Sequence, residues 1–334
     1  MPVITVIGSL NVDMVTRAER VPNAGETVQA KAFEVGWGGK GANQAVAAAR
    51  LSRSKDTLKS GTDISVRMIG AVGRDVFGPQ VVKSMEEDGI DMQGVQVLEG
   101  HETGTATILV EESTGENRIL VTPGANFALG HSKVDYGDIA IFQLETPMDL
   151  VLNHISEAIS DGAHVIFNPA PAQDFPRASY QDLGTLIVNE SEAATLLSLP
   201  EDSVTASADL TSIAARFISQ GVSNVIITLG GQGAFYQTQT RSAKGEKGKL
   251  LPAKKAKVID TTAAGDTFIG AYAVRVSSYL AQSKSAHSSR ASIYELPQEV
   301  MDAAIAFAIQ ASAKTVEKAG AQKTIPWLNE LEKA

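Results

Sequence analysis

The sequence predicts an α/β fold: a doubly wound, mostly parallel sheet flanked by helices, with a small β-sheet lid. From about residue 138 onward, short apolar strands alternate with helical segments, which is typical of consecutive βαβ units. Several of these strands end in polar or glycine residues, as at the ligand-binding edge of a parallel sheet. Alternating residues over about 14–36 and 95–122 predict further short strands, which we expect to form the lid.

Composition narrows the function classes. The chain has 334 residues, of which 43% are hydrophobic, so it can bury a sizeable core. A net charge of −9 argues against nucleic acid or an anionic membrane as a partner. The absence of cysteine excludes disulfides, thiolate metal sites and cysteine nucleophiles. No apolar run reaches the length of a membrane span, so we expect a cytoplasmic protein, also nuclear if the chain is eukaryotic.

The first predicted strand covers residues 3–8 and leads into Asn11 and Asp13. These two residues are two apart, so they point the same way if the chain stays extended. A carboxylate and an amide at the carboxyl end of a first strand suit a polyhydroxyl ligand. An Asx turn that closes the strand is the alternative.

A glycine-rich segment follows at 36–51, with the sequence GWGGKGANQAVAAARL. Its glycines match G-x-G-x-x-G, but the segment does not follow the first strand of a clear βαβ unit, so it is a weak dinucleotide fingerprint. It is not a P-loop, because Gly41 follows Lys40 where Ser or Thr is required. We expect a glycine turn that lets the backbone approach a ligand, then an alanine-rich helix with Asn43 facing the same ligand as the first strand.

The later strands supply polar groups to the same edge of the sheet. They are predicted over 66–72, 138–145, 164–170, 185–190 and 225–230. The second of these ends on Glu145, and the fourth runs directly into a helix that holds Glu192. Asn189 and Glu192, three apart across this junction, could hold a hydrated Mg²⁺ on phosphates, since Mg²⁺ keeps several waters.

The remaining segments are predicted to be structural. Residues 52–64 and the lysine-rich residues 244–257 are expected to be solvated loops, without a phosphate-binding role for the lysines. Residues 297–316 predict a long apolar helix. The five histidines are isolated in the sequence and lack metal-ligand spacing, so they are assigned no role.

The most informative stretch is DTTAAGDTF, residues 260–268. It is predicted to lie between a short strand at 256–259 and an apolar helix at 268–280. Its small residues 263–265 let a ligand approach N–H groups at a helix N-terminus, which is an anion site by geometry and dipole. Asp266 lies beside that site, where a carboxylate could accept a hydroxyl proton while the N–H groups hold a phosphoryl group. An N-capping Asp at an ordinary helix start is the alternative. Together these features indicate phosphoryl transfer to a hydroxyl.

Seven motifs occur in an order that identifies a family. They are GSLNVD (8–13), GGKGANQA (38–45), QLETP (143–147), NESE (189–192), TLGGQG (228–233), DTTAAGDTF (260–268) and KAGAQ (318–322). With them the chain resembles, nearly end to end, the ribokinase or phosphofructokinase-B-type family of carbohydrate kinases. The resemblance implies one doubly wound kinase domain over residues 1–334, a β lid that mediates homodimerisation, and ATP-dependent phosphorylation of the 5-hydroxyl of D-ribose.

The resemblance also implies roles for individual residues. It makes Asp266 the catalytic base, with an anion hole formed by Ala263, Ala264 and Gly265. It implies ribose contacts from Asn11, Val12, Asp13, Gly39, Lys40, Gly41, Ala42, Asn43, Glu145 and Asp266. It implies ATP contacts from Asn189, Thr228, Leu229, Gly230, Gly231, Gln232, Gly233, Gly265 and Asp266, with Glu192 acting through Mg²⁺. It implies a monovalent cation, K⁺, held by Asp260, Thr262, Thr315, Lys318, Gly320 and Thr324.

The chain departs from the family pattern at a few positions. Many relatives have Gly where Ala263 stands, and Ile309 lies where a polar neighbour of the nucleotide is expected. The stretches 52–64 and 240–257 are longer than in compact bacterial forms. A sibling kinase for another sugar or a nucleoside is one alternative function. A catalytically inactive sugar-binding sensor is another, against which the intact Asp266 argues.

Overall fold

In the computed structural model, which describes residues 1–57, 64–283 and 295–331, the main sheet has nine strands. Their order is β13-β12-β11-β10-β9-β8-β1-β4-β5. All neighbours are parallel except the antiparallel pairs that β12 makes with β11 and β13. The strands are β1 (Val3–Ile7), β4 (Ser65–Gly73), β5 (Asp91–Leu98), β8 (Ile139–Phe142), β9 (His164–Phe167), β10 (Thr185–Asn189), β11 (Asn224–Thr228), β12 (Ala234–Thr238) and β13 (Lys249–Leu251).

The strand order reverses at β1, which confirms the predicted doubly wound sheet. β1 pairs with β4 on one side and with β8 on the other. The chain therefore builds outward from the centre twice, in opposite directions. Ligands bind in the crevice at such a switch point, outside the carboxyl ends of the strands. Here that crevice lies where β1 runs into Ser9 and β8 runs toward Glu145.

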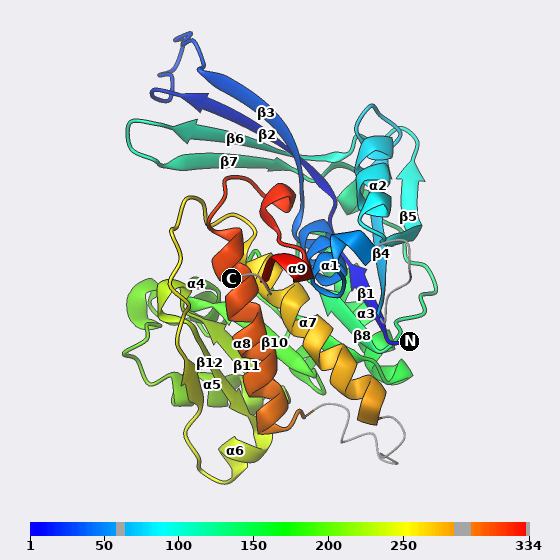
Figure 1. Ribbon diagram of the computed structural model, residues 1–334, viewed down its shortest axis with the longest axis vertical. Helices are drawn as coiled ribbons and strands as arrows, with labels where there is room; N and C mark the ends of the chain where they lie inside the picture. Colours follow the sequence, from blue (N-terminus) through cyan, green and yellow to red (C-terminus); the bar gives the residue numbers. More distant parts are fainter. Residues whose placement is uncertain (58–63, 284–294, 332–334) are drawn as a thin grey trace.

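Helices cover both faces of the sheet (Figure 1). One face packs against α1 (Lys40–Leu51), α2 (Gly78–Glu87), α7 (Ala264–Ser283) and α8 (Gln298–Thr315). The other packs against α3 (Met148–Asp161), α4 (Glu190–Leu196) and α5 (Leu210–Ile218). Two short helices, α6 (Gln239–Ala243) and α9 (Leu328–Leu331), complete the described set. Within the described ranges, no helix combines the length and the apolar character that crossing a bilayer needs.

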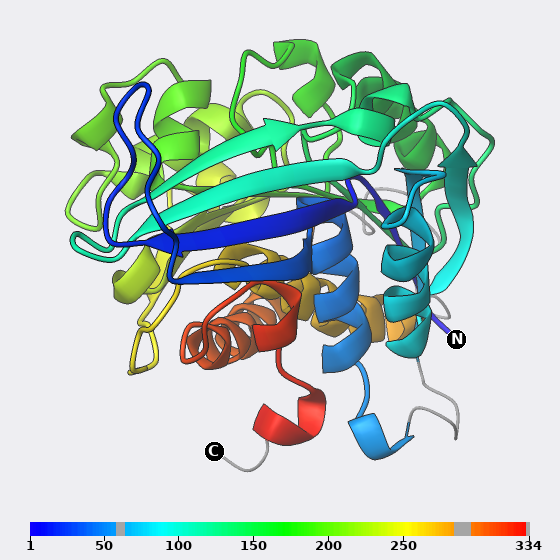
Figure 2. The ribbon, with the colours of Figure 1, turned by 90° about the horizontal axis from the view of Figure 1, so that it is seen from above.

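A second sheet projects from this body as the predicted lid (Figures 1 and 2). Its four strands run in the order β3-β2-β6-β7. They are β2 (Asn11–Ala18), β3 (Ala32–Gly38), β6 (Gly104–Glu111) and β7 (Asn117–Thr122). Residues 95–98, which we expected in the lid, instead belong to β5, because Val95 and Val97 pair with Gly70 and Val72 of the main sheet.

Two other segment predictions are wrong. No strand forms at 256–259: Val258 is 63% exposed, and Ile259 donates a single backbone hydrogen bond, to Val316 O. Apolar residues there line a ligand cavity instead of a sheet. The lysine-rich stretch 244–257 is also not all loop, because β13 within it pairs with β12.

Close packing of α1 against α7 positions the site. A Cβ on Gly270 would lie 2.5 Å from Ala47 Cβ and 2.6 Å from Ala48 N, closer than packed atoms allow. Glycine and alanine therefore let the two helix backbones meet. One turn earlier on each helix stand Asp266 and Gln44, which this packing brings into contact.

Candidate active site

Two cavities meet at the N-terminus of α7. The first, of about 210 Å³, is lined by Lys40, Asn168, Ile187, Val188, Asn189, Glu192, Thr228, Thr261, Ala263, Gly265, Asp266 and Ile269. The second, of about 410 Å³, shares Thr228, Thr261 and Gly265 with the first. A third space, between lid and body, is lined by Asp13 and by Asp260. The central nonapeptide thus borders every one of these spaces.

The turn before α7 presents unpaired N–H groups. Ala263 has a φ of +60°, a left-handed conformation that glycine would adopt more easily. Ala264 N–H donates to Thr261 O at 3.2 Å, so this predicted member of the anion hole is engaged. Among the described residues, neither the Gly265 N–H group nor the Asp266 N–H group donates a hydrogen bond. They stand at the positive end of a 20-residue helix, which favours an anion.

Asp266 is not an N-cap, because α7 begins at Ala264. Its buried carboxylate accepts two hydrogen bonds of 2.9 Å, from Asn43 Nδ2 and Gln44 Nε2. Asn43, expected to face the ligand, is therefore also a partner of the carboxylate. Gln44 was not among the predicted site residues. The sequence feature that could have indicated it is a polar glutamine among the alanines of a helix that packs on the core.

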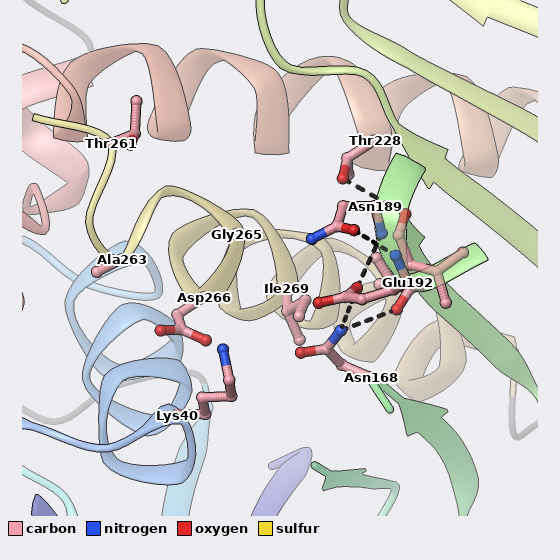
Figure 3. A pocket seen from close by; sticks show the side chains of 12 residues that line it. Lys40, Asn168, Asn189, Glu192, Thr228, Thr261, Ala263, Gly265, Asp266 and Ile269 are labelled. Atoms are coloured by element: carbon pink, nitrogen blue, oxygen red, sulfur yellow. Dashed lines mark hydrogen bonds between the residues drawn. The ribbon is translucent and has the colours of Figure 1, made fainter. Parts of the chain in front are cut away.

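Lys40 and Glu145 meet at the start of α1. Glu145 Oε2 accepts from Lys40 N–H at 2.9 Å and from Ser9 Oγ at 2.5 Å, which ties the ends of β1 and β8 to this helix. Figure 3 shows the Lys40 side chain directed toward Asp266. Burial lowers the pKa of the Lys40 ammonium, but Asp266, Glu145 and Glu192 outweigh this effect and raise the pKa above its ordinary value. Lys40 is thus a cation that offsets several carboxylates.

Asn11 and Asp13 lie in β2, so the chain is extended at these residues, as predicted, and the alternative Asx turn does not form. Asn11 Oδ1 accepts from Asn126 Nδ2 at 2.7 Å, and Asn126 is a buried residue that sequence reasoning missed. Burial, and then the charges of Glu145 and Asp266, raise the pKa of Asp13 to about 7. A carboxylate in such surroundings, without an ion pair to any described residue, suggests a ligand that donates hydrogen bonds.

Asn189 and Glu192 form a capping box at α4. Asn189 Oδ1 accepts from Glu192 N–H at 2.8 Å, and Glu192 Oε2 accepts from Asn189 N–H at 2.9 Å. Asn168 Nδ2 approaches the same Oε2 at 3.4 Å. Burial outweighs these bonds and raises the pKa of Glu192. Glu192 Oε1 accepts no hydrogen bond from the described residues, so it is available to a hydrated cation across the cavity (Figure 3).

The second cavity suits a planar apolar group. Phe268, Ile309 and Val316 line it, together with backbone from Gly230, Gly231 and Gly233. Lys254 and Lys255 also line it, although no ligand role was predicted for them. Leu229 packs its side chain in the core, and Gln232 is outside the lining of both cavities.

Val12 and Ala42 likewise bury their side chains in the core. At such positions only the backbone can reach a ligand. Gly41 leaves room for a close approach, since a Cβ there would lie 2.7 Å from Ser9 N. Gly39 adopts a φ of +88° before α1, where a side chain would be strained.

Asp260 joins the turn before α7 to the C-terminal loop. Its Oδ1 accepts from Thr262 N–H at 2.9 Å and Thr262 Oγ1 at 2.7 Å, and its Oδ2 accepts from Gly320 N–H at 2.9 Å. Burial raises the pKa of Asp260, but these hydrogen bonds outweigh it and hold the pKa below the usual value. No ion pair to Asp260 occurs in the described part of the chain.

The other predicted cation ligands have varied surroundings. Thr315 Oγ1 donates to Thr267 Oγ1 at 3.0 Å, inside the α7–α8 contact. Thr324 Oγ1 bonds Ala321 O at 2.8 Å, and Lys318 pairs with Glu330 at the surface. The structure thus brings Asp260, Thr262 and Gly320 together directly, whereas the side chains of Thr315, Thr324 and Lys318 bond other protein groups.

Two histidines are not isolated in space, contrary to the expectation from sequence. His131 and His154 stack with ring centroids 4.7 Å apart and 14° between planes, beside Glu157 and Tyr136. A metal bound by both rings would have to lie in both ring planes, which stacked rings do not allow. Glu157 accepts from His131 and from Tyr136, so the group is a hydrogen-bonded cluster between α3 and the loop before β8, away from the cavities.

Comparisons with known proteins agree on one family. The model of the pfkB family carbohydrate kinases matches residues 1–328. A ribokinase from Schizosaccharomyces pombe is 39% identical, over 98% of this chain and 96% of its own. A deoxyribokinase from Salmonella typhi is 34% identical, over 81% of this chain and 84% of its own. The solved Arabidopsis thaliana ribokinase complexed with ribose and ATP is 26% identical, with a TM-score of 0.81 over 99% of this chain and 98% of that one.

We predict that Asp13→Asn stabilises the unliganded protein at alkaline pH. In the folded protein the pKa of Asp13 is about 7, above the ordinary 3.8, so burying the ionised carboxylate lowers the free energy of unfolding. This loss of stability grows between about pH 4 and pH 7 and is constant above pH 7. Asn removes a penalty on the order of a few kcal/mol at pH 8, and less at pH 5. Urea unfolding at both pH values measures this.

The control is Asp135→Asn, at an exposed carboxylate whose pKa Arg67 and Gly137 N–H lower. This substitution should not stabilise the protein at pH 8. An Asp13→Asn stabilisation that is equal at pH 5 and pH 8 would contradict the assigned shift.

Proposed function

Because the chain belongs to the pfkB family of carbohydrate kinases, we propose that it transfers the γ-phosphoryl group of ATP to the 5-hydroxyl of D-ribose. One observation carries the proposal: the Asp266 carboxylate lies beside the unpaired N–H groups of Gly265 and Asp266, where two cavities meet. A base next to an anion site is what phosphoryl transfer to a hydroxyl requires. The ribokinase relatives, one of them complexed with ribose and ATP, support the choice of substrates.

The two substrates enter from opposite sides. Ribose lies below the lid, where Asn11 and Asp13 offer acceptors and the Lys40 ammonium offers donors for sugar hydroxyls. Adenine occupies the apolar second cavity, and the phosphates extend into the first cavity toward α7. This arrangement sets the 5-hydroxyl oxygen in line with the γ-phosphorus, which is the main requirement of the reaction.

The chemical step is a displacement at phosphorus. As the 5-oxygen forms its bond to the γ-phosphorus, Asp266 accepts the hydroxyl proton and later releases it to water. The bond from the γ-phosphorus to the bridging oxygen breaks, and ADP leaves. The N–H groups of Gly265 and Asp266 hold the negative charge that spreads over the transferring group, and Lys40 offsets it.

Two cations fit donor sets of this chain. Glu192, with its free Oε1, would hold a hydrated Mg²⁺ together with Asn189, and bound Mg²⁺ supplies positive charge against the phosphates. Asp260 and nearby carbonyl oxygens of the C-terminal loop are hard ligands that suit K⁺, which would add positive charge beside a carboxylate that has Arg17 nearby but forms no ion pair among the described residues.

Two other functions have weaker support. The 34% identity to a deoxyribokinase favours a sibling sugar kinase as the second candidate. A non-catalytic sensor would bind ribose without turnover. A coupled assay of ATP use with ribose, deoxyribose, fructose, adenosine and no sugar separates these possibilities. Turnover highest with ribose supports the proposal, and turnover highest with another acceptor contradicts it.

We predict that Asp266→Asn retains ribose and ATP binding and loses turnover by about 10²–10⁴-fold, the usual cost of a missing general base. Asn cannot take the proton, although it keeps one oxygen for the donors Asn43 and Gln44. Calorimetry and steady-state kinetics measure the two properties, and thermal unfolding checks the fold. A mutant with more than half of wild-type turnover would show that the base is another residue.

The cation proposal predicts activation by K⁺. Activity in K⁺ should be well above that in Na⁺ or tetramethylammonium at matched ionic strength, because a fitting cation fixes the turn that aims the N–H groups. Asp260→Ala should remove the dependence and leave a low basal rate. Equal wild-type activity in K⁺ and tetramethylammonium would disprove this proposal.

The lid supports a homodimer. The exposed side chains of Val35 and Leu120 lie on the lid face opposite Asp13, in a row that also holds Met14 and Thr107, and Leu120 is 73% exposed. Exposed apolar patches mark interaction sites, and we propose that this patch packs against the lid of a second copy of this chain. Leu120→Glu should convert a dimer to monomer in sedimentation velocity, while Val76→Glu, at an exposed apolar residue outside the lid, should not. A monomeric wild type at micromolar concentration would rule the dimer out.

A further inference from the structure

The carboxylate of Asp266 is held by two adjacent side chains of α1. Asn43 Nδ2 donates to Oδ2 and Gln44 Nε2 donates to Oδ1, each at 2.9 Å. With both oxygens bonded, the carboxylate cannot rotate without breaking a charged hydrogen bond. Gln44 is 0% exposed, so its amide serves other protein groups and does not contact bulk solvent.

Asp266 and a second glutamine, Gln143, together fix the orientation of the Gln44 amide. A carboxylate only accepts, so Gln44 must present its NH₂ group to Asp266. Its Oε1 then accepts from Gln143 Nε2 at 2.6 Å. Gln143 follows β8 and is itself buried, and a Cβ on Gly8 would collide with its Oε1. The glycine that ends β1 thus makes room for the residue that orients Gln44.

The same amide reaches toward the opposite side of the first cavity. Gln44 Nε2 lies 3.4 Å from Asn168 Oδ1, and Asn168 Nδ2 lies 3.4 Å from Glu192 Oε2. Asn168 is held in turn by a 3.0 Å bond to Ile187 O. One chain of amides therefore connects Asp266 on α7 with Glu192 on α4, through Gln44 on α1 and Asn168 just after β9.

We propose that Gln44 is a positioning residue that aims the Asp266 carboxylate at the attacking hydroxyl, with Gln143 as its support. The inference rests on the proposed role of Asp266 as the base. Proton transfer in the displacement needs one carboxylate oxygen to face the hydroxyl, and a misplacement of about 1 Å can cost about 10²-fold in rate. Gln44 prevents that misplacement without contacting a substrate.

The test is a double-mutant cycle between Gln44→Met and Asp266→Asn. Methionine keeps the length of the side chain and removes the hydrogen bonds to Asp266, Gln143 and Asn168. With Asp266 intact, Gln44→Met should lower kcat by about 10- to 100-fold, the worth of a hydrogen bond to a charged group, and change KM for ribose and ATP less than about threefold. In the Asp266→Asn background it should change kcat less than about twofold, because no base remains to be aimed.

Two further variants complete the design. Gln237→Met removes another fully buried, hydrogen-bonded glutamine outside the site, and should lower the unfolding temperature with no change in kcat. Gln143→Met leaves Gln44 in place and should lower kcat in the wild-type background only, which keeps the proposal testable if Gln44→Met fails to fold.

The outcomes separate this inference from the proposed function. An unchanged kcat in Gln44→Met, or an equal loss in both backgrounds, overturns the positioning role while Asp266 remains the base. Near-wild-type turnover in Asp266→Asn alone overturns the base assignment, and the positioning role with it. A kcat loss confined to enzymes that retain Asp266 supports both.

Discussion

The constraint on which this structure depends is the confinement of like charges. Asp13, Glu145 and Asp266 share one buried region, and the charges of the other two help to raise the pKa of Asp13. A buried carboxylate without partners is costly, and neighbouring ones add repulsion. Lys40 offsets part of this cost as a cation, and amide or N–H donors hold Glu145 and Asp266. A cluster of carboxylates suits the proposed function, in which the site accepts a hydroxyl proton and hydrogen bonds from a sugar.

Backbone proximity is what allows these groups to converge. Small residues stand wherever two main chains meet: Gly41 against Ser9, and Gly270 against Ala47 and Ala48. The charged side chains come from the carboxyl ends of strands at the switch point of the sheet and from the first turns of α1 and α7. Strand ends and helix starts both direct polar groups into one crevice. The fold therefore determines where these side chains lie, and the sequence motifs determine which chemical groups stand there.

The parts predicted well from sequence are those with a local signal. Strands with polar ends, the start of α4 at Asn189 and the helix after the central nonapeptide each depend on neighbours in the chain. The contact of Gln44 with Asp266 joins residues 222 apart, and nothing local in the sequence shows it. The predicted strand at 256–259 failed for a related reason: its apolar residues face a cavity, a tertiary feature that β propensity cannot distinguish from a sheet. The pairing of His131 with His154 was missed because a loop and a helix bring them together.

The turn before α7 links strain to function. The left-handed Ala263 costs about 1–2 kcal/mol relative to an ordinary conformation, and the surrounding structure must maintain it. Asp260 does so by bonding Thr262 on one side and Gly320 on the other, which fastens the turn to the C-terminal loop. The bonds set the course of the backbone, and a cation would neutralise the carboxylate behind the N–H groups that we propose bind the phosphate. In the proposed reaction the charge of Asp260 would repel the phosphates of ATP unless it is compensated, and Arg17 together with a bound cation would compensate it.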